Sequence, residues 1–214
     1  MRGKFITFEG GEGAGKSTQA RLLAERLRAA GRDVLVTREP GGSPFAEQLR
    51  TLILDPAMPP HAPLAEALLF SAARSDHVET VIRPALSSGR WVICDRFADS
   101  TRVYQGAAGG LASETLQALE RIVVADTRPD LTVLIDLDPA EGLARVGRRG
   151  AAAGTTDDAY ETRGLAYHQK LRAGFLALAA AEPRRVVVVD GSATVEAIAS
   201  DVLALVGSRL GTLS

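Results

Sequence analysis

The residues best suited to chemistry lie near the N-terminus, where Gly10 to Ser17 read GGEGAGKS and fit the pattern G-x-x-x-x-G-K-[ST]. Glycines at these positions let backbone N–H groups turn toward a phosphate, and the start of a following helix adds partial positive charge. The Lys16 ammonium group can then reach the β- and γ-phosphates of a nucleotide, and the Ser17 hydroxyl can bind Mg²⁺. A merely flexible turn would not require this lysine and serine, so the stretch predicts a nucleotide site.

Two acidic residues end apolar runs in the manner of a carboxylate that lies near Mg²⁺ in such sites. Asp95 follows WVIC, and Asp136 follows LTVLI. Asp95 is the favoured metal ligand, beside Ser17, because it precedes Arg96 and a polar loop. Asp136 leads instead into an Asp-Pro pair typical of a helix start, which favours a structural role.

Three arginines lie near the expected carboxyl edge of the sheet, where open α/β sheets bind ligands. Arg38 follows VLVT, Arg96 follows WVICD, and Arg74 lies one helical turn after Phe70 on the same helix face. A guanidinium group suits a phosphate or the edge of a base, and a phenyl ring offers a stacking surface. Taken separately, each arginine is explained as well by a structural ion pair, so both interpretations stay open.

A nucleotide site does not by itself define a reaction, because GTPases, motor ATPases and small-molecule kinases share it. The chain lacks the N-K-x-D pattern that reads guanine, the nearest stretch being TRPD at residues 127–130, and its 214 residues are few for an oligomeric motor. A kinase of a small acceptor fits best. A non-catalytic nucleotide switch is the alternative from another class, but it leaves the polar stretch DRFADSTRVYQG without a purpose.

The elements that must position these residues are visible as alternating apolar runs and helical segments. Runs without polar alternation predict strands that are buried on both faces, at residues 5–8, 34–37, 91–94, 131–137 and 185–190. Helical spacing predicts helices at residues 17–31, 63–89, 113–125, 164–182 and 194–210. Gly31 is expected to end the first helix, Pro84 to kink the second or end its first part, and Ser113 to cap the third. This order predicts one α/β domain over residues 1–214, with a parallel sheet covered on both faces.

Residues 147–156, with the sequence GRRGAAAGTT, are too small and flexible to predict a packed element. A helix and a strand that the sheet needs follow this stretch. It is therefore interpreted as a mobile loop within the domain and not as a linker between domains.

The composition limits the classes of partner. Net charge is −1, from 25 basic and 26 acidic residues, which gives no overall field to hold a nucleic acid polymer or an anionic membrane. The one cysteine, Cys94, lies in an apolar run and is expected to be a buried thiol. The N-terminal residues lack the apolar stretch of a signal peptide, and no run of about 20 apolar residues occurs. These features predict a cytoplasmic protein.

Five stretches in this order and spacing closely resemble the bacterial thymidylate kinase family: FEGGEGAGKST, TREPGG, LLFSAAR, DRFADSTRVYQG and RPDLTVLIDLDP. The resemblance covers nearly the whole chain and weakens from about residue 150 to 162 and over the last helix. It implies a three-layer P-loop kinase fold with five parallel strands and a mobile lid at about residues 147–162. It also implies transfer of phosphate from ATP, with Mg²⁺, to the small molecule dTMP, and a homodimer formed through helices. Another pyrimidine nucleotide or deoxynucleoside as acceptor is the alternative within this class.

The resemblance also implies roles for individual residues. ATP phosphates and Mg²⁺ would be held by Gly10, Gly11, Glu12, Gly13, Ala14, Gly15, Lys16, Ser17 and Thr18. The acceptor would be bound by Glu9, Arg38, Arg50, Phe70, Arg74, Arg96, Thr101, Tyr104 and Gln105. Arg38 and Arg96 would grip the dTMP phosphate, Phe70 would stack on thymine, and Arg74 would donate to its exocyclic carbonyl. The Tyr104 ring would crowd a 2′-hydroxyl and so favour deoxyribose.

The chain departs from the family pattern at two positions. Phe97 follows the Asp-Arg pair where the family commonly has Tyr or His, which removes a polar group. In the lid, the family's Asp-Arg-aromatic-Glu run reads here Asp158, Ala159, Tyr160 and Glu161, so alanine replaces the expected catalytic arginine. We expect a mobile cation from Arg149 first, then Arg145 and Arg163, with Arg148 as a further candidate, to act beside Lys16 and Arg96 on the phosphates.

Overall fold

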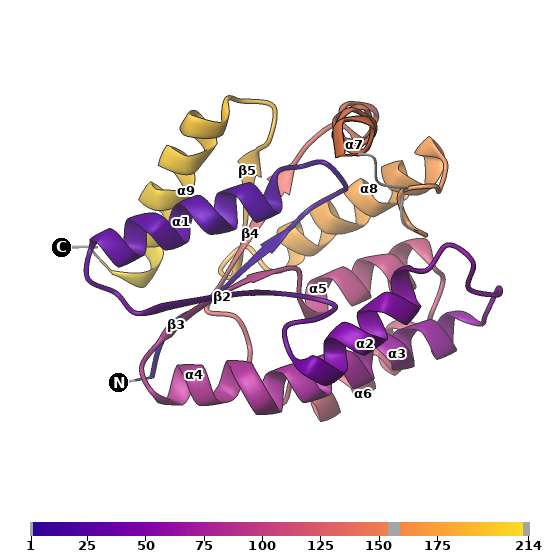
Figure 1. Ribbon diagram of the computed structural model, residues 1–214, viewed down its shortest axis with the longest axis horizontal. Coiled ribbons are helices and arrows are strands. Elements are labelled where there is room, and N and C mark those ends of the chain that lie inside the picture. Colours follow the sequence, from indigo (N-terminus) through magenta and orange to yellow (C-terminus); the bar gives the residue numbers. More distant parts are fainter. Residues whose placement is uncertain (1, 154–158, 212–214) are drawn as a thin grey trace.

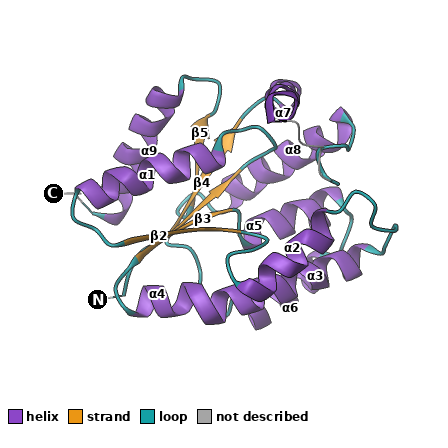
Figure 2. Cartoon of the chain, viewed as in Figure 1, coloured by secondary structure: helices purple, strands orange, loops and turns teal. Residues whose placement is uncertain are grey.

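Five parallel strands form the central sheet in the computed structural model, which describes residues 2–153 and 159–211 (Figure 1, Figure 2). The strands lie in the spatial order β2-β3-β1-β4-β5, so β1 is central. Their bounds are β1 Phe5–Glu9, β2 Val34–Arg38, β3 Trp91–Asp95, β4 Leu131–Asp136 and β5 Val186–Asp190. The five strands predicted from the sequence are confirmed, each with one end displaced by a single residue.

Helices cover both faces of the sheet, as the alternating sequence pattern predicts (Figure 1). On one face, α1 (Lys16–Ala29) and α9 (Val195–Leu210) pack against Ile6 and Phe8 of β1. Phe5 belongs to the core on the other face, because successive side chains of a strand point to opposite sides. Each of these buried side chains contributes about 1.5–3 kcal/mol relative to exposure. The apolar runs therefore lack polar alternation because both faces are buried.

The remaining helices lie on the second face and around the carboxyl edge of the sheet. They are α2 Pro44–Leu54, α3 Pro63–His77, α4 Arg83–Ser87, α5 Ala98–Thr101, α6 Ser113–Val123, α7 Pro139–Ala153 and α8 Leu165–Ala181, with π-helical segments η1 Val78–Ile82 and η2 Arg102–Ala108. Within the described part of the chain, none of these helices combines the length and apolar character that a bilayer crossing requires.

The long helix expected over residues 63–89 is continuous but changes its hydrogen-bond register before Pro84. Residues 78–82 form η1, and the N–H of Arg83 donates to the carbonyl of Val78, five residues earlier. Proline has no N–H and its ring clashes with the preceding turn. The wider π turn accommodates the proline, so that α4 can begin directly after η1.

The prediction of a mobile loop at residues 147–156 is wrong for residues 147–153, because α7 continues to Ala153. The helix is already nucleated at Pro139, so adding residues to it is much easier than starting a helix. Alanines after Gly150 are the strongest helix formers and offset the roughly 1 kcal/mol penalty of each glycine. Residues 154–158 of the predicted lid, including Asp158, lie outside the described residues.

Two helix starts were also misjudged from the sequence. α2 was missing from the prediction, although Ser43 accepts a hydrogen bond from the Ala46 N–H at 3.3 Å and Pro44 occupies the first turn. Ser113 is not the N-cap of α6. It is the first helical residue, and its hydroxyl accepts a hydrogen bond from the side chain of Gln117.

The carboxyl ends of three neighbouring strands bring the sequence-predicted residues together. Arg38 at the end of β2 pairs in register with Asp95 of β3, and Phe8 of β1 also pairs with Asp95. The loop after β1 leads into α1, and the loop after β3 leads into α5. The phosphate-binding loop from Gly10 to Gly15 (the P-loop), Arg38 at the end of β2 and Arg96 directly after β3 therefore meet at one edge of the sheet.

Candidate active site

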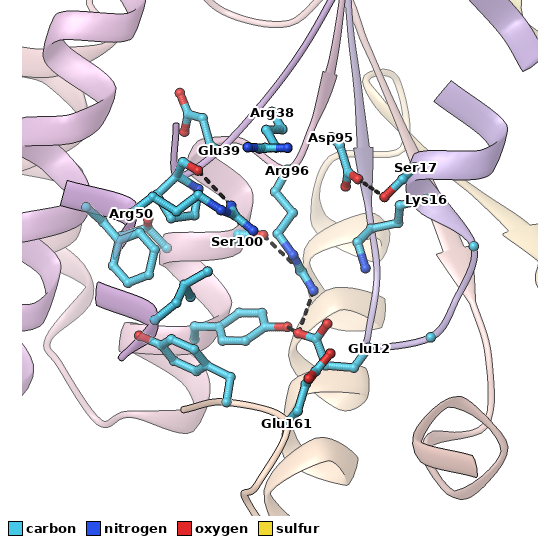
Figure 3. A pocket seen from close by; sticks show the side chains of 18 of the residues that line it. Glu12, Lys16, Ser17, Arg38, Glu39, Arg50, Asp95, Arg96, Ser100 and Glu161 are labelled. Atoms are coloured by element: carbon cyan, nitrogen blue, oxygen red, sulfur yellow. Dashed lines mark hydrogen bonds and ion pairs between the residues drawn. The ribbon is translucent and has the colours of Figure 1, made fainter. Parts of the chain in front are cut away.

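A cavity of about 490 Å³ opens at this edge, and most of the predicted site residues line it (Figure 3). Those that do are Glu12, Gly13, Gly15, Lys16, Ser17, Thr18, Arg38, Arg50, Phe70, Asp95, Arg96, Thr101, Tyr104, Gln105, Arg145 and Arg149. Gly10, Gly11 and Ala14 belong to the same loop between β1 and α1. Glu9, Arg74 and Arg163 lie outside this lining.

The loop from Gly10 to Gly15 requires glycine at Gly13 for two reasons. Gly13 has a positive φ of 68°, in the left-handed region that disfavours other residues. A Cβ atom there would also lie 2.1 Å from the carbonyl oxygen of Gly142 on α7. This contact leaves no room for a larger side chain, such as an arginine, at this position of the loop.

Lys16 and the Ser17–Asp95 pair stand side by side at the start of α1. The Lys16 side chain is buried, and its Nζ donates to the carbonyl of Gly11 at 2.7 Å. Burial, together with the nearby Arg96 charge, lowers the pKa of Lys16. The Ser17 hydroxyl donates to Oδ2 of Asp95. The two predicted metal ligands are therefore in direct contact, across 78 residues of sequence.

Arg96 occupies the centre of the cavity and holds several groups at once. It has a positive φ of 67°, and its guanidinium group donates to the Gly10 carbonyl at 3.0 Å and to Glu12 at 2.6 Å. Tyr104 donates its hydroxyl to the same Glu12 oxygen at 2.7 Å, and its ring lies 5.1 Å from the Arg96 guanidinium carbon. Burial raises the pKa of Glu12, but the charges of Arg96 and Lys16 outweigh it and lower that pKa to about 2. Glu12 is therefore a carboxylate that neutralises Arg96.

Glu9 is buried and does not line the cavity. Its Oε1 accepts from the N–H groups of Phe97 (2.8 Å) and Ser100 (3.3 Å), and its Oε2 accepts from the Ser100 hydroxyl (2.6 Å). Burial, and then the charge of Asp99, raise the pKa of Glu9 to about 7. Glu9 thus fixes the turn that carries Arg96 into the cavity.

Aromatic and basic residues form the wall of the cavity that lies opposite the P-loop, here named the acceptor wall. Phe70 lines it from α3, and Tyr104 and Gln105 line it from η2. The Arg50 guanidinium group donates to the carbonyl of Pro40 at 2.7 Å, and Arg38 is paired with Glu47 of α2 at 3.1 Å. Helix α2, which the sequence prediction lacked, therefore orients both arginines.

Arg74 is buried beneath this wall. Its Nε donates to Glu39 at 2.7 Å, and its NH2 group donates to the Phe97 carbonyl at 3.2 Å and to Thr101 at 3.0 Å. Glu39 also contacts His77 at 3.1 Å. Thr101 lines the cavity, so Arg74 adjoins the acceptor wall through it. The predicted contact of Arg74 with an exocyclic carbonyl stays a prediction.

The lid arginines divide into two groups. Arg145 and Arg149 line the cavity from α7, where Arg145 is paired with Glu141 at 2.6 Å and the largely exposed Arg149 with Glu161 at 3.2 Å. Arg163 instead stacks over the ring of Tyr160 at 4.6 Å. Arg148 is exposed on α7. Two of the candidate cations therefore face the same cavity as Lys16.

Several residues of the site were missed from the sequence. Glu39, Ser100, Tyr160 and Glu161 also line the cavity. Glu39 lies inside the TREPGG stretch and Ser100 inside DRFADS, so both stand beside residues that were noticed. Their roles depend on contacts with distant segments, which no local pattern reports.

The fold and the site together define a class: a P-loop kinase in which a phosphate-binding loop and an acceptor wall of aromatic and arginine side chains share one cavity. The family model described as "Thymidylate kinase" matches residues 8–202. The chain belongs to the thymidylate kinase family.

Similar proteins agree over nearly the whole chain. The thymidylate kinase of Nitrobacter winogradskyi is 53% identical over 210 residues, covering 98% of this chain and 90% of that protein. The thymidylate kinase of Caulobacter vibrioides is 52% identical over 210 residues, covering 98% of this chain and 99% of that protein. The crystal structure of thymidylate kinase from Ehrlichia chaffeensis superposes with a TM-score of 0.76 at 32% identity, covering 96% of this chain and 99% of that chain.

Proposed function

We propose that this chain transfers the γ-phosphate of ATP to dTMP, giving ADP and dTDP. The observation that carries the proposal is one cavity lined both by Lys16 and Ser17 of the P-loop and by Phe70, Tyr104 and Gln105 of the opposite wall. Membership of the thymidylate kinase family supports the same reaction. A cavity that has a donor half at the P-loop and an acceptor half at the opposite wall suits a transfer between two nucleotides, because it can hold donor and acceptor in line.

The donor half is suited to ATP and Mg²⁺. Backbone N–H groups of the loop from Gly10 to Gly15 and the start of α1 would hold the phosphates. Ser17 and Asp95 offer a hydroxyl and a carboxylate oxygen in contact with each other, the ligand type that Mg²⁺ takes beside phosphate oxygens. When bound, the ion would neutralise charge on the β- and γ-phosphates.

The acceptor half is suited to a pyrimidine nucleoside monophosphate. The Phe70 ring would stack on the base, and the Tyr104 ring, held by Glu12 and Arg96, would fill the space of a 2′-hydroxyl. Arg96 and Arg38 would bind the acceptor phosphate. A phosphate placed against Arg96 would compete with the Glu12 carboxylate for the same donor groups.

Catalysis would rest on position and positive charge. The acceptor phosphate oxygen attacks the γ-phosphorus in line, and no covalent intermediate with the protein is needed. Lys16, Arg96 and the α7 residues Arg149 and Arg145 would surround the transferred group with cations. Exclusion of water by the closed cavity would keep ATP from being hydrolysed.

A panel of acceptors tests the proposed function. ADP release is measured with ATP and Mg²⁺ in the presence of dTMP, dUMP, UMP, CMP or thymidine. We expect dTMP to give the highest kcat/KM. Preference for another acceptor would assign the chain to another pyrimidine substrate, and tight ATP binding without acceptor-stimulated turnover would indicate a nucleotide switch.

The assembly and location of the enzyme stay predictions. A homodimer formed through helices is expected, and light scattering of the purified chain would measure its mass against the 22.5 kDa of a monomer. A cytoplasmic location is expected as well, and microscopy of a fluorescent fusion in the source cells would test it.

A further inference from the structure

The carboxylate of Glu66 on α3 gathers side chains from three separate segments. Its Oε2 accepts from Nε2 of Gln105 on η2 at 3.0 Å. Its Oε1 accepts from the hydroxyl of Tyr160 at 2.8 Å and lies 3.4 Å from the guanidinium group of Arg163, both just before α8. The His61 ring lies 3.6 Å away. Only 12% of the Glu66 side chain is exposed, so these contacts are largely shielded from solvent.

The contact with Glu66 fixes the orientation of the Gln105 amide. A carboxylate has no proton to donate, so only the NH₂ end of the amide can face it. The carbonyl end of Gln105, a buried residue that lines the cavity, then remains for the acceptor. A carbonyl can accept from the N3–H of thymine or uracil, whereas N3 of cytosine carries no hydrogen. In this orientation Gln105 matches a base that carries a hydrogen at N3.

The same carboxylate holds the segment that follows the lid. The Tyr160 ring is buried, with its centroid 5.6 Å from that of Tyr104 and 6.2 Å from that of Phe70. Arg163 stacks between the rings of Tyr160 and Tyr167, 4.6 Å from each centroid. Burial and the neighbouring Glu66 charge raise the pKa of Tyr160, so its hydroxyl remains a donor. The exit of the lid is therefore attached to the acceptor wall.

We propose that Glu66 is a positioning residue that orients the amide of Gln105 toward the base of the acceptor and anchors Tyr160 and Arg163, at the exit of the lid, to the same wall. The inference rests on the proposed function. It assigns to one carboxylate both the choice of base and the attachment of the lid. Since Glu66 itself lies outside the cavity lining, it acts through Gln105 and Tyr160.

A double-mutant cycle that measures KM tests whether Glu66 acts on acceptor binding through Gln105. In the parent chain, Glu66→Ala should raise KM for dTMP about fivefold, the scale of one hydrogen bond between neutral groups, and change KM for ATP less than twofold. On a Gln105→Ala background the same substitution should change KM for dTMP less than twofold. An equal rise on both backgrounds would overturn the proposal, because Glu66 would then act without Gln105.

Two further variants separate this role from a general effect on folding. Glu79→Ala removes a carboxylate of η1 that is paired with Arg83 away from the cavity, and should leave both KM values unchanged. Glu66→Gln keeps the size of the side chain but can present either end of an amide to Gln105. Its preference for dTMP over dCMP should fall about threefold or more, with a melting temperature near that of the parent. An unchanged preference would overturn the proposal.

The attachment of Tyr160 and Arg163 to Glu66 can be tested without a substrate. Trypsin cleaves after arginine, and Arg163 is held by Glu66 and two aromatic rings. Cleavage after Arg163 should become several-fold faster in Glu66→Ala than in Glu79→Ala. Equal rates would contradict the proposal that Glu66 anchors Arg163. A parent chain that does not use dTMP would contradict the proposed function itself, whereas normal dTMP turnover with unaffected variants contradicts only this inference.

Discussion

Several charged residues of the cavity already have partners within this chain. Arg96 is neutralised by Glu12, Ser17 donates to Asp95, and Arg149 lies against Glu161. These carboxylates lie where nucleotide phosphates would bring further negative charge. Binding of the two nucleotides is thus expected to exchange some of these internal contacts for contacts with phosphate, so that a buried charge keeps a partner.

Lys16 gives the most direct prediction at the scale of a residue. Lys16→Ala should lower kcat by about a hundredfold or more, because it removes a preorganised cation next to the transferred phosphate. The Lys16 side chain is buried beside Arg96, and burial, followed by the Arg96 charge, lowers the pKa of Lys16. Removing it also relieves this repulsion, so urea unfolding should show little loss of stability. A variant with parental kcat would exclude Lys16 from catalysis.

Glu9 gives a prediction about pH. Because burial, and then Asp99, raise its pKa from 4.5 to about 7, the folded protein binds a proton there that the unfolded chain has released. Its contribution to stability therefore falls as pH rises through this window and levels off above it. Glu9→Gln keeps a carbonyl for the Phe97 and Ser100 N–H groups but does not titrate. The stability of this variant relative to the parent should thus increase from about pH 5 to about pH 7.5.

Urea denaturation at several pH values measures this difference. Glu25→Gln, which alters an exposed carboxylate on α1, serves as the control. A difference between Glu9→Gln and the parent that stays flat with pH would show that Glu9 does not titrate in this range.

At the scale of an element, helix α7 separates what the sequence could predict from what it could not. The Asp-Pro pair was recognised as a helix start, and the Asp138 carboxylate accepts from the Ala140 N–H at 2.9 Å. The extent of the helix was not recognised, because glycines suggested a loop and the effect of earlier nucleation is not local. The packing of Gly142 against Gly13 of the P-loop could not be predicted from the sequence either, because it joins residues 129 positions apart.

Helix α7 also carries the prediction for the lid. Arg149→Ala should lower kcat by about a hundredfold or more, with little change in KM for ATP, because this cation would act only on the transferred phosphate. Arg145→Ala should have a smaller effect, since Arg145 is also bonded to Glu141 and to the Gly191 carbonyl. Arg121→Ala on α6 provides an exposed control. Full kcat in both lid variants would mean that the cation comes from elsewhere.

At the scale of the whole molecule, the order of elements was largely predictable and the buried polar contacts were not. Apolar runs and helical spacing are local signals, and they predicted all five strands and the edge where Arg38, Asp95 and the P-loop meet. The Glu39–Arg74–His77 cluster joins β2 loop residues to α3, 35 and 38 positions apart. Such a pairing depends on the final packing of helix on sheet, which a single sequence does not encode in its spacing.

A second buried network ties the strands to the acceptor helices. Arg185, which precedes β5, donates to both oxygens of Asp99 on α5 at 2.6 and 2.9 Å and to Thr132 of β4 at 2.8 Å. The Asp99 side chain is only 5% exposed. Thr132 in turn lies 2.8 Å from Thr7 of β1. This network therefore links the centre of the sheet to the turn that carries Arg96.

Removing one partner of this network should destabilise the whole molecule. Arg185→Ala is expected to lower the free energy of unfolding by about 3 kcal/mol, because it leaves the buried Asp99 carboxylate with Arg102 as a more distant cation, at 3.4 Å. Arg21→Ala, which breaks an exposed pair on α1, should change it by about 0.5 kcal/mol or less. Adding Asp99→Asn to Arg185→Ala removes the incompletely paired charge and should recover part of the loss in urea denaturation. If the double variant were less stable than Arg185→Ala alone, the loss would come from packing of the arginine and not from the buried charge.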